Sequence, residues 1–449
     1  MIPFLGGADA AAPCLRDDRT REWVSYGELS DLALSWRDRL QGEKGLVFLY
    51  ARNDVPTVAV LLGAIAGGHA VALLDPKLPE ASKRELGDVY RPDFEIDCSA
   101  VDQLVVRNRD NPPPHPSLAV LLSTSGSTGS RKFVRLNLGN LRSNAVAIAD
   151  VLDIGSDSVA SGHLPLHYSF GLSVLTSHLS AGARTVLTER GFMEREFWTA
   201  MKEAEVTHVP GVPFHFAILE RLGYQRLDLP QLAALMQAGG HLDVAARQRA
   251  HAYMDQRGGR FYVMYGQTEA SPRMTTLQHE DFPVAPASVG RALPGGKLEI
   301  ESADAEGGGE VVYHGPNVMM GYSEQRSDLE KGDELGGVLH TGDLGFLDAA
   351  GRLTLTGRAK RSAKVYGLRV NLDEVEKLTN TLCRSAVVQT GANLRIFYEE
   401  GIEARPDELR QLLLSRFSLP TGSFTFRALQ SLPRTERGKI DYQRLGEMQ

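Results

Sequence analysis

The sequence feature that most constrains the fold is the passage of an apolar run into a loop of small residues at 118–132, LAVLLSTSGSTGSRK. Its first five residues, Leu118 to Leu122, have the composition of a buried strand. Glycines let the following turn gather backbone N–H groups into a concave anion site, and Lys132 adds a charge suited to phosphate oxygens. The stretch predicts a strand that leads into a phosphate-binding loop, whose candidate residues are Thr124, Ser125, Gly126, Ser127, Thr128 and Gly129.

Two other interpretations of this loop were weighed. A P-loop of the form GxxxxGK[ST] needs a glycine before the lysine and a hydroxyl after it, and Arg131 and Phe133 occupy those positions. A Ser/Gly-rich composition is also typical of a surface linker. The apolar run before the loop and Lys132 at its end favour the phosphate site over the linker.

Length and charge bound the class of protein. The chain has 449 residues, too many for a single core, and two or three domains are expected. With 42% hydrophobic and 23% charged residues, it resembles an ordinary globular protein. The formal net charge of -7 argues against a nucleic-acid partner held by overall basicity, although a local site can still hold a nucleotide.

Cysteines and terminal sequence indicate the compartment. The three cysteines, Cys14, Cys98 and Cys383, are far apart and have no metal-ligand spacing, which favours a reducing compartment and no structural zinc. The N-terminus has no basic segment before its weak apolar run, so no signal peptide is expected and the predicted location is cytoplasmic.

One uncharged stretch, residues 55–74, could be taken for a membrane span. Pro56 lies near its start, and a Gly-Gly-His sequence at 67–69 divides it into a helix-length and a strand-length piece. The favoured interpretation is a buried helix, a tight turn and a buried strand, with no membrane span.

Helix-like and strand-like segments alternate through most of the chain, which predicts an α/β fold. Helices are expected at 26–40, 138–151 and 194–204, the second of them following the phosphate turn, and strands at 45–50, 70–74, 185–187 and 206–209. The proline-rich segment 107–116 is expected to be irregular. After Gly290, short runs predict a smaller β subdomain, and from Ala359 a compact α+β region is expected.

A second motif is YGQTE, from Tyr265 to Glu269, which follows the strand-like FYVM. On its own it could be any junction between a strand and a loop. A carboxylate such as Glu269 is, however, what a phosphate site needs to hold Mg²⁺, so the two motifs together favour a nucleotide site.

The two motifs resemble those of the adenylate-forming superfamily, which includes acyl-CoA synthetases, firefly luciferase and the adenylation domains of nonribosomal peptide synthetases. Further segments similar to the family follow in its order: LPLHYSFGLS (164–173), QAGGHL (237–242), GGEVVYHGPNVMMGY (308–322), TGDLG (341–345), GRAKRSAKVYGLRVNLDEVE (357–376) and PRTERGKID (433–441). The resemblance implies a large N-terminal domain at 1–357, built of α/β subdomains and a β subdomain. It also implies a small mobile α+β domain at 358–449, with a hinge near 358–361.

The resemblance assigns roles on ATP. The Ser/Thr/Gly loop and Lys132 would hold the β and γ phosphates, and Glu269 would ligate Mg²⁺. Tyr265 would stack on adenine and Thr268 would touch the α-phosphate. The glycines assigned to the nucleotide site are Gly239, Gly240 and Gly266.

Three further residues receive roles from the resemblance. Asp343 would accept hydrogen bonds from the ribose hydroxyls, with Arg358 beside it. Lys439 would bridge the substrate carboxylate and the α-phosphate, stabilising charge in the transition state. Without the family, Lys439 would be taken for a solvated lysine in a frayed tail.

The resemblance to the family also implies movement of the small domain. Lys360 falls at the family's hinge position, and Gly367 lies in a loop that shapes the acceptor tunnel, although that glycine could equally form a simple turn. The proline usual before the loop lysine is replaced by Arg131.

The aromatic segment bears on the substrate. Amino-acid-activating members carry an aspartate there, whereas this chain has HYSFG at 167–171, so an α-amino acid is disfavoured and an aryl, fatty or other small organic acid is preferred. The aromatic residues could equally be core packing, and His167 could be a phosphate or carboxylate contact or a core histidine. The candidate pocket residues are His167, Tyr168, Phe170, Gly171 and Pro213.

The predicted function is ATP- and Mg²⁺-dependent formation of an acyl-adenylate, then transfer of the acyl group to a thiol of CoA or of a phosphopantetheine-bearing acyl carrier protein. An alternative is direct amide formation with an amine. A non-catalytic nucleotide-binding scaffold would be expected to lack catalytic residues, but Lys132, Glu269, Asp343 and Lys439 are all present.

Overall fold

In the computed structural model, the described residues are 2–98, 104–106, 111–123, 132–303, 307–358, 362–365, 368–390, 393–399, 406–417, 420–435 and 439–448. They form two compact units. The first comprises Met1–Leu298 and Tyr313–Leu339, and the second comprises Glu299–Val312 and His340–Gln449.

The first unit contains a seven-stranded sheet of order β18-β8-β7-β4-β3-β5-β6. Its inner pairs β4–β7, β3–β4 and β3–β5 are parallel, and the outer pairs are antiparallel. Parallel strands joined by helices are what the alternating α/β pattern predicts. The strands are β3 (Leu46–Tyr50), β4 (Ala70–Leu74), β5 (Phe94–Asp97), β6 (Leu104–Val106), β7 (Leu118–Ser123), β8 (Phe133–Asn137) and β18 (Gly321–Ser323).

A nine-stranded sheet of order β15-β14-β13-β12-β11-β9-β10-β1-β2 completes the sheets of this unit. It is parallel from β1 to β13 and antiparallel at both edges. Its strands are β1 (Pro13–Asp17), β2 (Trp23–Ser25), β9 (Val159–Gly162), β10 (Arg184–Leu187), β11 (His208–Gly211), β12 (Ala234–Gln237), β13 (Arg260–Gly266), β14 (Arg273–Leu277) and β15 (Arg291–Ala292).

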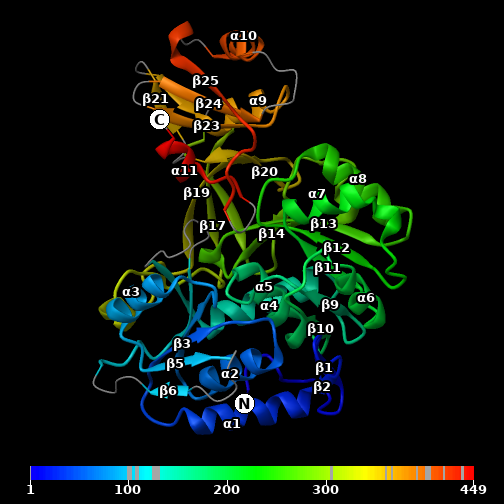
Figure 1. The fold of residues 1–449 in the computed structure, drawn as a ribbon, viewed down its shortest axis with the longest axis vertical. Helices are drawn as coiled ribbons and strands as arrows, with labels where there is room; N and C mark the ends of the chain where they lie inside the picture. The colour runs from blue at the N-terminus through cyan, green and yellow to red at the C-terminus, as the bar shows by residue number, and fades with distance from the viewer. Residues whose placement is uncertain are drawn as a thin grey trace. The chain divides into compact units, whose positions relative to one another are not determined.

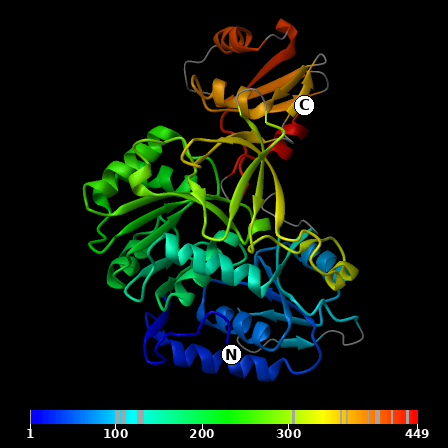
Figure 2. The ribbon, with the colours of Figure 1, turned by 180° about the vertical axis from the view of Figure 1, so that it is seen from behind.

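Helices cover these sheets, and α4 and α5 pack side by side (Figures 1 and 2). The helices of the unit are α1 (Tyr26–Arg39), α2 (Val55–Ala66), α3 (Glu80–Tyr90), α4 (Leu138–Val151), α5 (Ser169–Ser180), α6 (Arg195–Glu203), α7 (Pro213–Leu222) and α8 (Val244–Asp255). The expected helix at 138–151 is confirmed with the same bounds.

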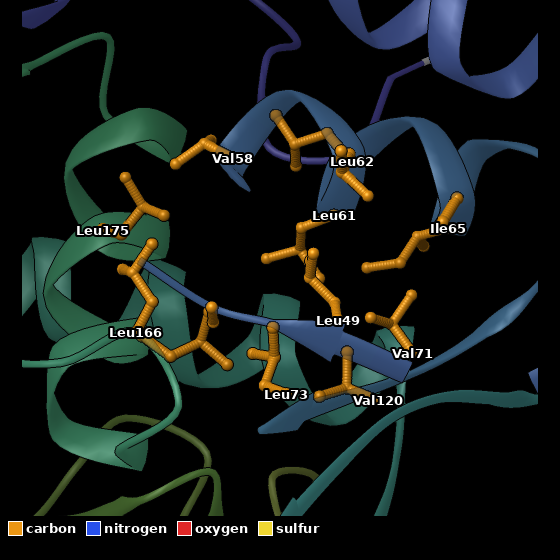
Figure 3. Packing of buried hydrophobic residues seen from close by; sticks show 14 of the residues in the cluster. Leu49, Val58, Leu61, Leu62, Ile65, Val71, Leu73, Val120, Leu166 and Leu175 are labelled. Atoms are coloured by element: carbon orange, nitrogen blue, oxygen red, sulfur yellow. The ribbon is translucent and has the colours of Figure 1, made fainter. Parts of the chain in front are cut away.

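The uncharged stretch 55–74 forms α2, a turn and β4, as predicted. Asp54 caps α2 by accepting a hydrogen bond from the Thr57 N–H, and Pro56 occupies its first turn. A helix that is apolar all round must be buried, and α2 packs between α1 and the strands β3 and β4, with Leu175 of α5 beside it (Figure 3). Labelled there are Leu49, Val58, Leu61, Leu62, Ile65, Val71, Leu73, Val120, Leu166 and Leu175. Within the described ranges, every helix is too short or too polar to cross a membrane.

Close packing of α1 on α2 depends on Gly63. A Cβ there would lie 2.3 Å from the Ala33 carbonyl oxygen and 2.8 Å from the Trp36 Cβ. We expect Gly63→Ala to lower the free energy of unfolding by about 1–3 kcal/mol, because the helices must separate. Gly87→Ala in α3 is the matched control, since the nearest atom would be 4.0 Å away. The control should gain about 0.5–1 kcal/mol in urea unfolding, and equal effects of the two changes would contradict the packing argument.

The second unit contains a four-stranded sheet of order β16-β17-β19-β20, three of whose strands are labelled in Figure 1. Its strands are β16 (Lys297–Glu301), β17 (Gly309–His314), β19 (Val338–Leu347) and β20 (Leu353–Arg358). An α+β region follows, as expected, with a hairpin and a three-stranded sheet of order β23-β24-β25. Its elements are β21 (Ser362–Val365), β22 (Leu368–Asn371), α9 (Leu372–Thr379), β23 (Ser385–Thr390), β24 (Asn393–Glu399), α10 (Pro406–Arg416), β25 (Phe424–Leu429) and α11 (Tyr442–Glu447).

Two expectations need comment. The helix expected after the phosphate turn is preceded by β8, which pairs antiparallel with β7, so the loop joins two strands of a hairpin. The predicted division at residue 357, with a hinge near 358–361, concerns movement and stays a prediction. Residues 359–361 lie outside the described residues.

Candidate functional site

Two side chains of the first unit, those of Lys132 and Glu269, meet at Tyr322. The Lys132 Nζ atom lies 3.6 Å from the ring centroid. On the same tyrosine, the hydroxyl donates a hydrogen bond of 2.9 Å to Glu269 Oε1. Strand pairing explains the meeting, because β18 runs antiparallel to β8 with Tyr322 opposite Val134, two residues after Lys132. Lys132, predicted to bind phosphate, and Glu269, predicted to bind Mg²⁺, are thus linked through Tyr322.

Glu269 is held by the connection between β13 and β14. This connection is tight at Gly266, where a Cβ would lie 1.9 Å from the Pro272 carbonyl oxygen. The Gln267 N–H donates to that same oxygen at 2.9 Å. The Glu269 carbonyl accepts a hydrogen bond of 2.8 Å from the Met319 N–H, close to β18. The backbone of Glu269 is therefore fixed relative to Tyr322.

The electrostatics of this cluster favour a bound cation and a bound anion together. Burial and the nearby Glu269 carboxylate raise the pKa of Tyr322, which keeps the phenol protonated as a donor. Lys132 Nζ lies 3.9 Å from Glu324 Oε1 at the surface, a distance at which the pair contributes little. Within the part of the chain that the structure describes, Glu269 forms no ion pair, so its half-buried charge is available to a metal ion.

Four predicted residues gather at the start of α5. Gly239 has φ +78°, and a Cβ there would lie 2.4 Å from the Tyr168 hydroxyl oxygen. At Gly240, a Cβ would lie 3.1 Å from Pro213 Cγ. Glycine is therefore required at 239 both by the backbone conformation and by the close approach of a side chain. These contacts bring together the two segments proposed to wall the acyl pocket.

The neighbouring threonine of the YGQTE motif joins the same region. Thr268 is buried, and its hydroxyl lies 3.1 Å from the hydroxyl of Ser169, the first residue of α5. Tyr265 is also buried, at the end of β13. The ring of Phe170 packs edge-on at 6.3 Å from the Tyr168 ring. The roles predicted for these residues toward a nucleotide or an acid stay predictions.

The other two candidates in the aromatic segment have clear neighbours. His167 is buried and its Nε2 atom lies 3.6 Å from Oδ2 of Asp75, which directly follows β4. A Cβ at Gly171 would lie 2.3 Å from the Pro165 carbonyl oxygen, so glycine is needed for α5 to pack on the preceding turn. Packing alone therefore explains Gly171.

In the second unit, Asp343 and Arg358 are paired. They lie opposite each other on β19 and β20, and Arg358 Nε donates to Asp343 Oδ1 at 3.0 Å. The Asp343 side chain is 7% exposed, whereas that of Arg358 is 61% exposed. The Asp343 N–H donates to Thr341 Oγ1 at 3.1 Å, which fixes the backbone. Arg358 thus lies beside Asp343, as the resemblance implies.

Lys439 lies beside a short antiparallel bridge. Arg434 and Ile440 form an antiparallel bridge, and the Thr435 N–H donates to the Lys439 carbonyl at 2.7 Å. Asp441 then caps α11 through the Arg444 N–H. These bonds fix the backbone at Lys439 and directly after it, so the frayed-tail alternative does not describe these residues.

Comparison with known families agrees with the motifs. The family model described as AMP-binding enzyme matches residues 7–323. The chain belongs to the AMP-binding enzyme family. The family match confirms the resemblance to adenylate-forming enzymes that the motifs of this AMP-binding enzyme indicated.

Relatives of this AMP-binding enzyme include several acid–thiol ligases. An oxalate–CoA ligase of Arabidopsis thaliana is 30% identical over 348 residues, which cover 72% of this chain and 66% of that protein. A 2-succinylbenzoate–CoA ligase of Lactococcus lactis is 27% identical over 75% of this chain and 74% of its own. An L-proline–[L-prolyl-carrier protein] ligase of Streptomyces coelicolor is 30% identical over 73% and 66%. The predicted class of AMP-forming acid–thiol ligase agrees with these names.

Solved structures confirm the fold class. The o-succinylbenzoate CoA synthetase of Bacillus subtilis, in complex with an acyl-adenylate intermediate, superposes with a TM-score of 0.81 at 20% identity and covers 100% of this chain and 99% of that one. ATP-bound MatB of Rhodopseudomonas palustris gives 0.77 at 19% identity, with 98% and 96% covered. The α/β prediction with a small C-terminal α+β region is correct.

Some predicted residues lie outside the described residues. They are Thr124, Ser125, Gly126, Ser127, Thr128 and Gly129 of the loop, with Arg131, Lys360 and Gly367. Conversely, the sequence analysis assigned no role to Tyr322, although it ends the quoted motif GGEVVYHGPNVMMGY. Its position at the end of that motif was a usable signal, but its contact with Lys132 comes from strand pairing between distant segments.

Proposed function

We propose that this AMP-binding enzyme activates a carboxylic acid with ATP, forming an acyl-adenylate and pyrophosphate, and then transfers the acyl group to a thiol. The observation that carries the proposal is the arrangement of Lys132 and Glu269 around Tyr322. It sets an ammonium group and a carboxylate close together, as the phosphates of ATP and their metal ion require. The relatives' names as CoA and carrier-protein ligases support the same chemistry.

The carboxylate of Glu269 fits Mg²⁺. One of its oxygens accepts a hydrogen bond from the Tyr322 hydroxyl, and the carboxylate has no positively charged partner among the described residues. Mg²⁺ is commonly held by one or two carboxylates together with phosphate oxygens. When bound, the ion would neutralise charge on the phosphates. A solved o-succinylbenzoate CoA synthetase contains ATP and magnesium, which supports the assignment.

The chain's own residues would divide the work of adenylation. Lys132 binds the phosphates that leave as pyrophosphate, and Thr268 contacts the α-phosphate. Asp343 accepts hydrogen bonds from the ribose hydroxyls, with its carboxylate oriented by Arg358. Lys439 stabilises the negative charge that develops as the substrate carboxylate attacks the α-phosphorus.

The next question is which acid the enzyme activates and which acceptor receives the acyl group. The acids in the relatives' names range from oxalate to L-proline, so similarity does not select one substrate. The aromatic segment 164–173 carries no carboxylate that could pair with an α-ammonium group, which disfavours amino acids. For the acceptor we propose CoA or the phosphopantetheine thiol of an acyl carrier protein.

A screen of pyrophosphate release tests this function. Aryl, short-chain, long-chain and amino acids would each be supplied with ATP and Mg²⁺, alone and with CoA, a loaded carrier protein or amines. We expect pyrophosphate with a non-amino acid, and a thioester once the thiol is added. Identification of an amide as the sole acylated product would contradict the proposed transfer to a thiol.

Tyr322 provides a prediction specific to this arrangement. Tyr322→Phe keeps the ring under Lys132 but removes the hydrogen bond to Glu269, and a hydrogen bond to a charged group contributes about 1.5–3 kcal/mol. We expect the half-saturating Mg²⁺ concentration to rise about tenfold or more. Tyr322→Leu, which also removes the ring, should additionally raise the KM for ATP. Unchanged Mg²⁺ titrations in both variants would show that Tyr322 does not position these groups.

A further inference from the structure

Arg273, the first residue of β14, is a buried cation whose side chain has no oxygen acceptor among the described residues. The residue is 2% exposed, and its Nη1 atom donates to the sulfur of Met264. The guanidinium carbon lies 5.0 Å from the centroid of the Phe170 ring. Among the residues that the structure describes, no carboxylate pairs with Arg273.

The other buried arginines of the described chain are different. Arg135 donates to four backbone carbonyls and to Glu334, and Arg326 pairs with Asp93 at 2.9 Å. Arg16 pairs with Glu203, and Arg247 donates to two carbonyl oxygens. Each has at least two oxygen acceptors, as a buried charge requires. Arg273 departs from this pattern next to Phe170, one of the candidate residues of the acyl pocket.

The charge of Arg273 is retained at neutral pH. Burial lowers its pKa to about 9, and the guanidinium is therefore still protonated at pH 7. A buried positive charge that faces only a ring and a thioether is costly unless an anion pairs with it. The other four buried arginines of the described chain all donate to carboxylate or carbonyl oxygens.

A small cavity borders Arg273 on the side of α5. It has a volume of about 10 Å³, enough for one water molecule, and it is lined by Phe170, Ser173, Ser177, His178 and Met236, among others. His178 donates from Nδ1 to the Val174 carbonyl at 2.9 Å, and its Nε2 atom has no hydrogen-bond partner among the described residues. Both a donor, Arg273, and an acceptor, His178 Nε2, therefore border this cavity.

We propose that Arg273 binds a second anionic group on the acyl substrate, so that the acid activated by this enzyme is a dicarboxylic acid. This inference rests on the proposed function, in which Tyr168 and Phe170 wall the acyl pocket. One carboxylate reacts with ATP, and the other pairs with the guanidinium. The present cavity is too small for a carboxylate, and the flexible side chain of Met264 must move to admit it.

Matched substrates test the charge. The probes are straight-chain dicarboxylic acids of increasing length, their monomethyl esters, which keep the shape but lose the second charge, and the matching ω-hydroxy acids. We expect kcat/KM for the preferred dicarboxylic acid to exceed that for its ester by about 100-fold or more. Preference for the ester, or for an ω-hydroxy acid held between Arg273 and His178, would overturn the inference.

Variants locate the effect. Arg273→Met should lose most of the preference for the dicarboxylic acid while keeping or gaining activity on the ester, and Arg273→Lys should recover part of it. Arg142→Met, on an exposed position of α4, is the control. An equal loss on both substrates would show that Arg273 acts only in the fold.

Binding without turnover separates this inference from the proposed function. The dicarboxylic acids alone should raise the Tm of the wild-type protein but not of Arg273→Met. If this difference is found while no acid yields pyrophosphate, the proposed function fails and anion binding by Arg273 stands. If acids are activated but dicarboxylic acids neither bind nor react in preference, the inference fails and the proposed function stands.

Discussion

Lys439→Ala should reduce acid-dependent pyrophosphate release by about 1,000-fold, the scale of loss when a group that stabilises transition-state charge is removed. Its carbonyl accepts a hydrogen bond from the Thr435 N–H, and Arg434 bridges to Ile440, contacts that do not involve the Lys439 side chain. The variant is therefore expected to keep its fold. Lys377→Ala, on an exposed position of α9, is the matched control and should be fully active.

The second half-reaction sharpens this prediction. If Lys439 acts only on adenylation, the variant supplied with a preformed acyl-adenylate should still transfer the acyl group to the thiol at close to the wild-type rate. Near wild-type pyrophosphate release by Lys439→Ala would exclude the assigned role. Loss of both half-reactions together would indicate a structural role instead.

Glu269→Gln should produce the second large effect. The amide keeps the size of the side chain but loses the charge that would hold Mg²⁺, so kcat/KM should fall by about 100-fold or more and rise only partly at high Mg²⁺. The control is Glu324→Gln, since this exposed carboxylate lies 3.9 Å from Lys132 and is expected to matter little. Equal Mg²⁺ titrations for wild type and Glu269→Gln would contradict the metal assignment.

Sequence patterns predicted several local elements well and missed others, among them the strand β8. The helix 138–151 and the strand 70–74 were found with their observed bounds because their periodicity or apolar composition is local. The strand β8 was missed because Arg135 interrupts its apolar residues. That arginine is fully buried and donates to the Tyr322 carbonyl and to Glu334, partners that lie far away in the sequence.

The site shows the same limit. Lys132 and Glu269 each belong to a short motif, so sequence and family resemblance could propose them. Their link through Tyr322 depends on the pairing of β8 with β18 and could not be read from either motif. Similarly, the contact between Gly239 and Tyr168 joins residues of different elements. Arg273 gave no signal in the sequence, because an arginine is usually exposed and only its burial makes it unusual.

The most direct test of the central claim is to identify the nucleotide product. The wild-type protein would be incubated with ATP, Mg²⁺, CoA and the acid selected by the screen, and the products separated. We predict AMP and pyrophosphate in equal amounts with the acyl thioester, and acid-dependent exchange of labelled pyrophosphate into ATP when CoA is omitted. Formation of ADP and inorganic phosphate, or exchange that does not depend on the acid, would contradict the assignment as an acyl-adenylate-forming ligase.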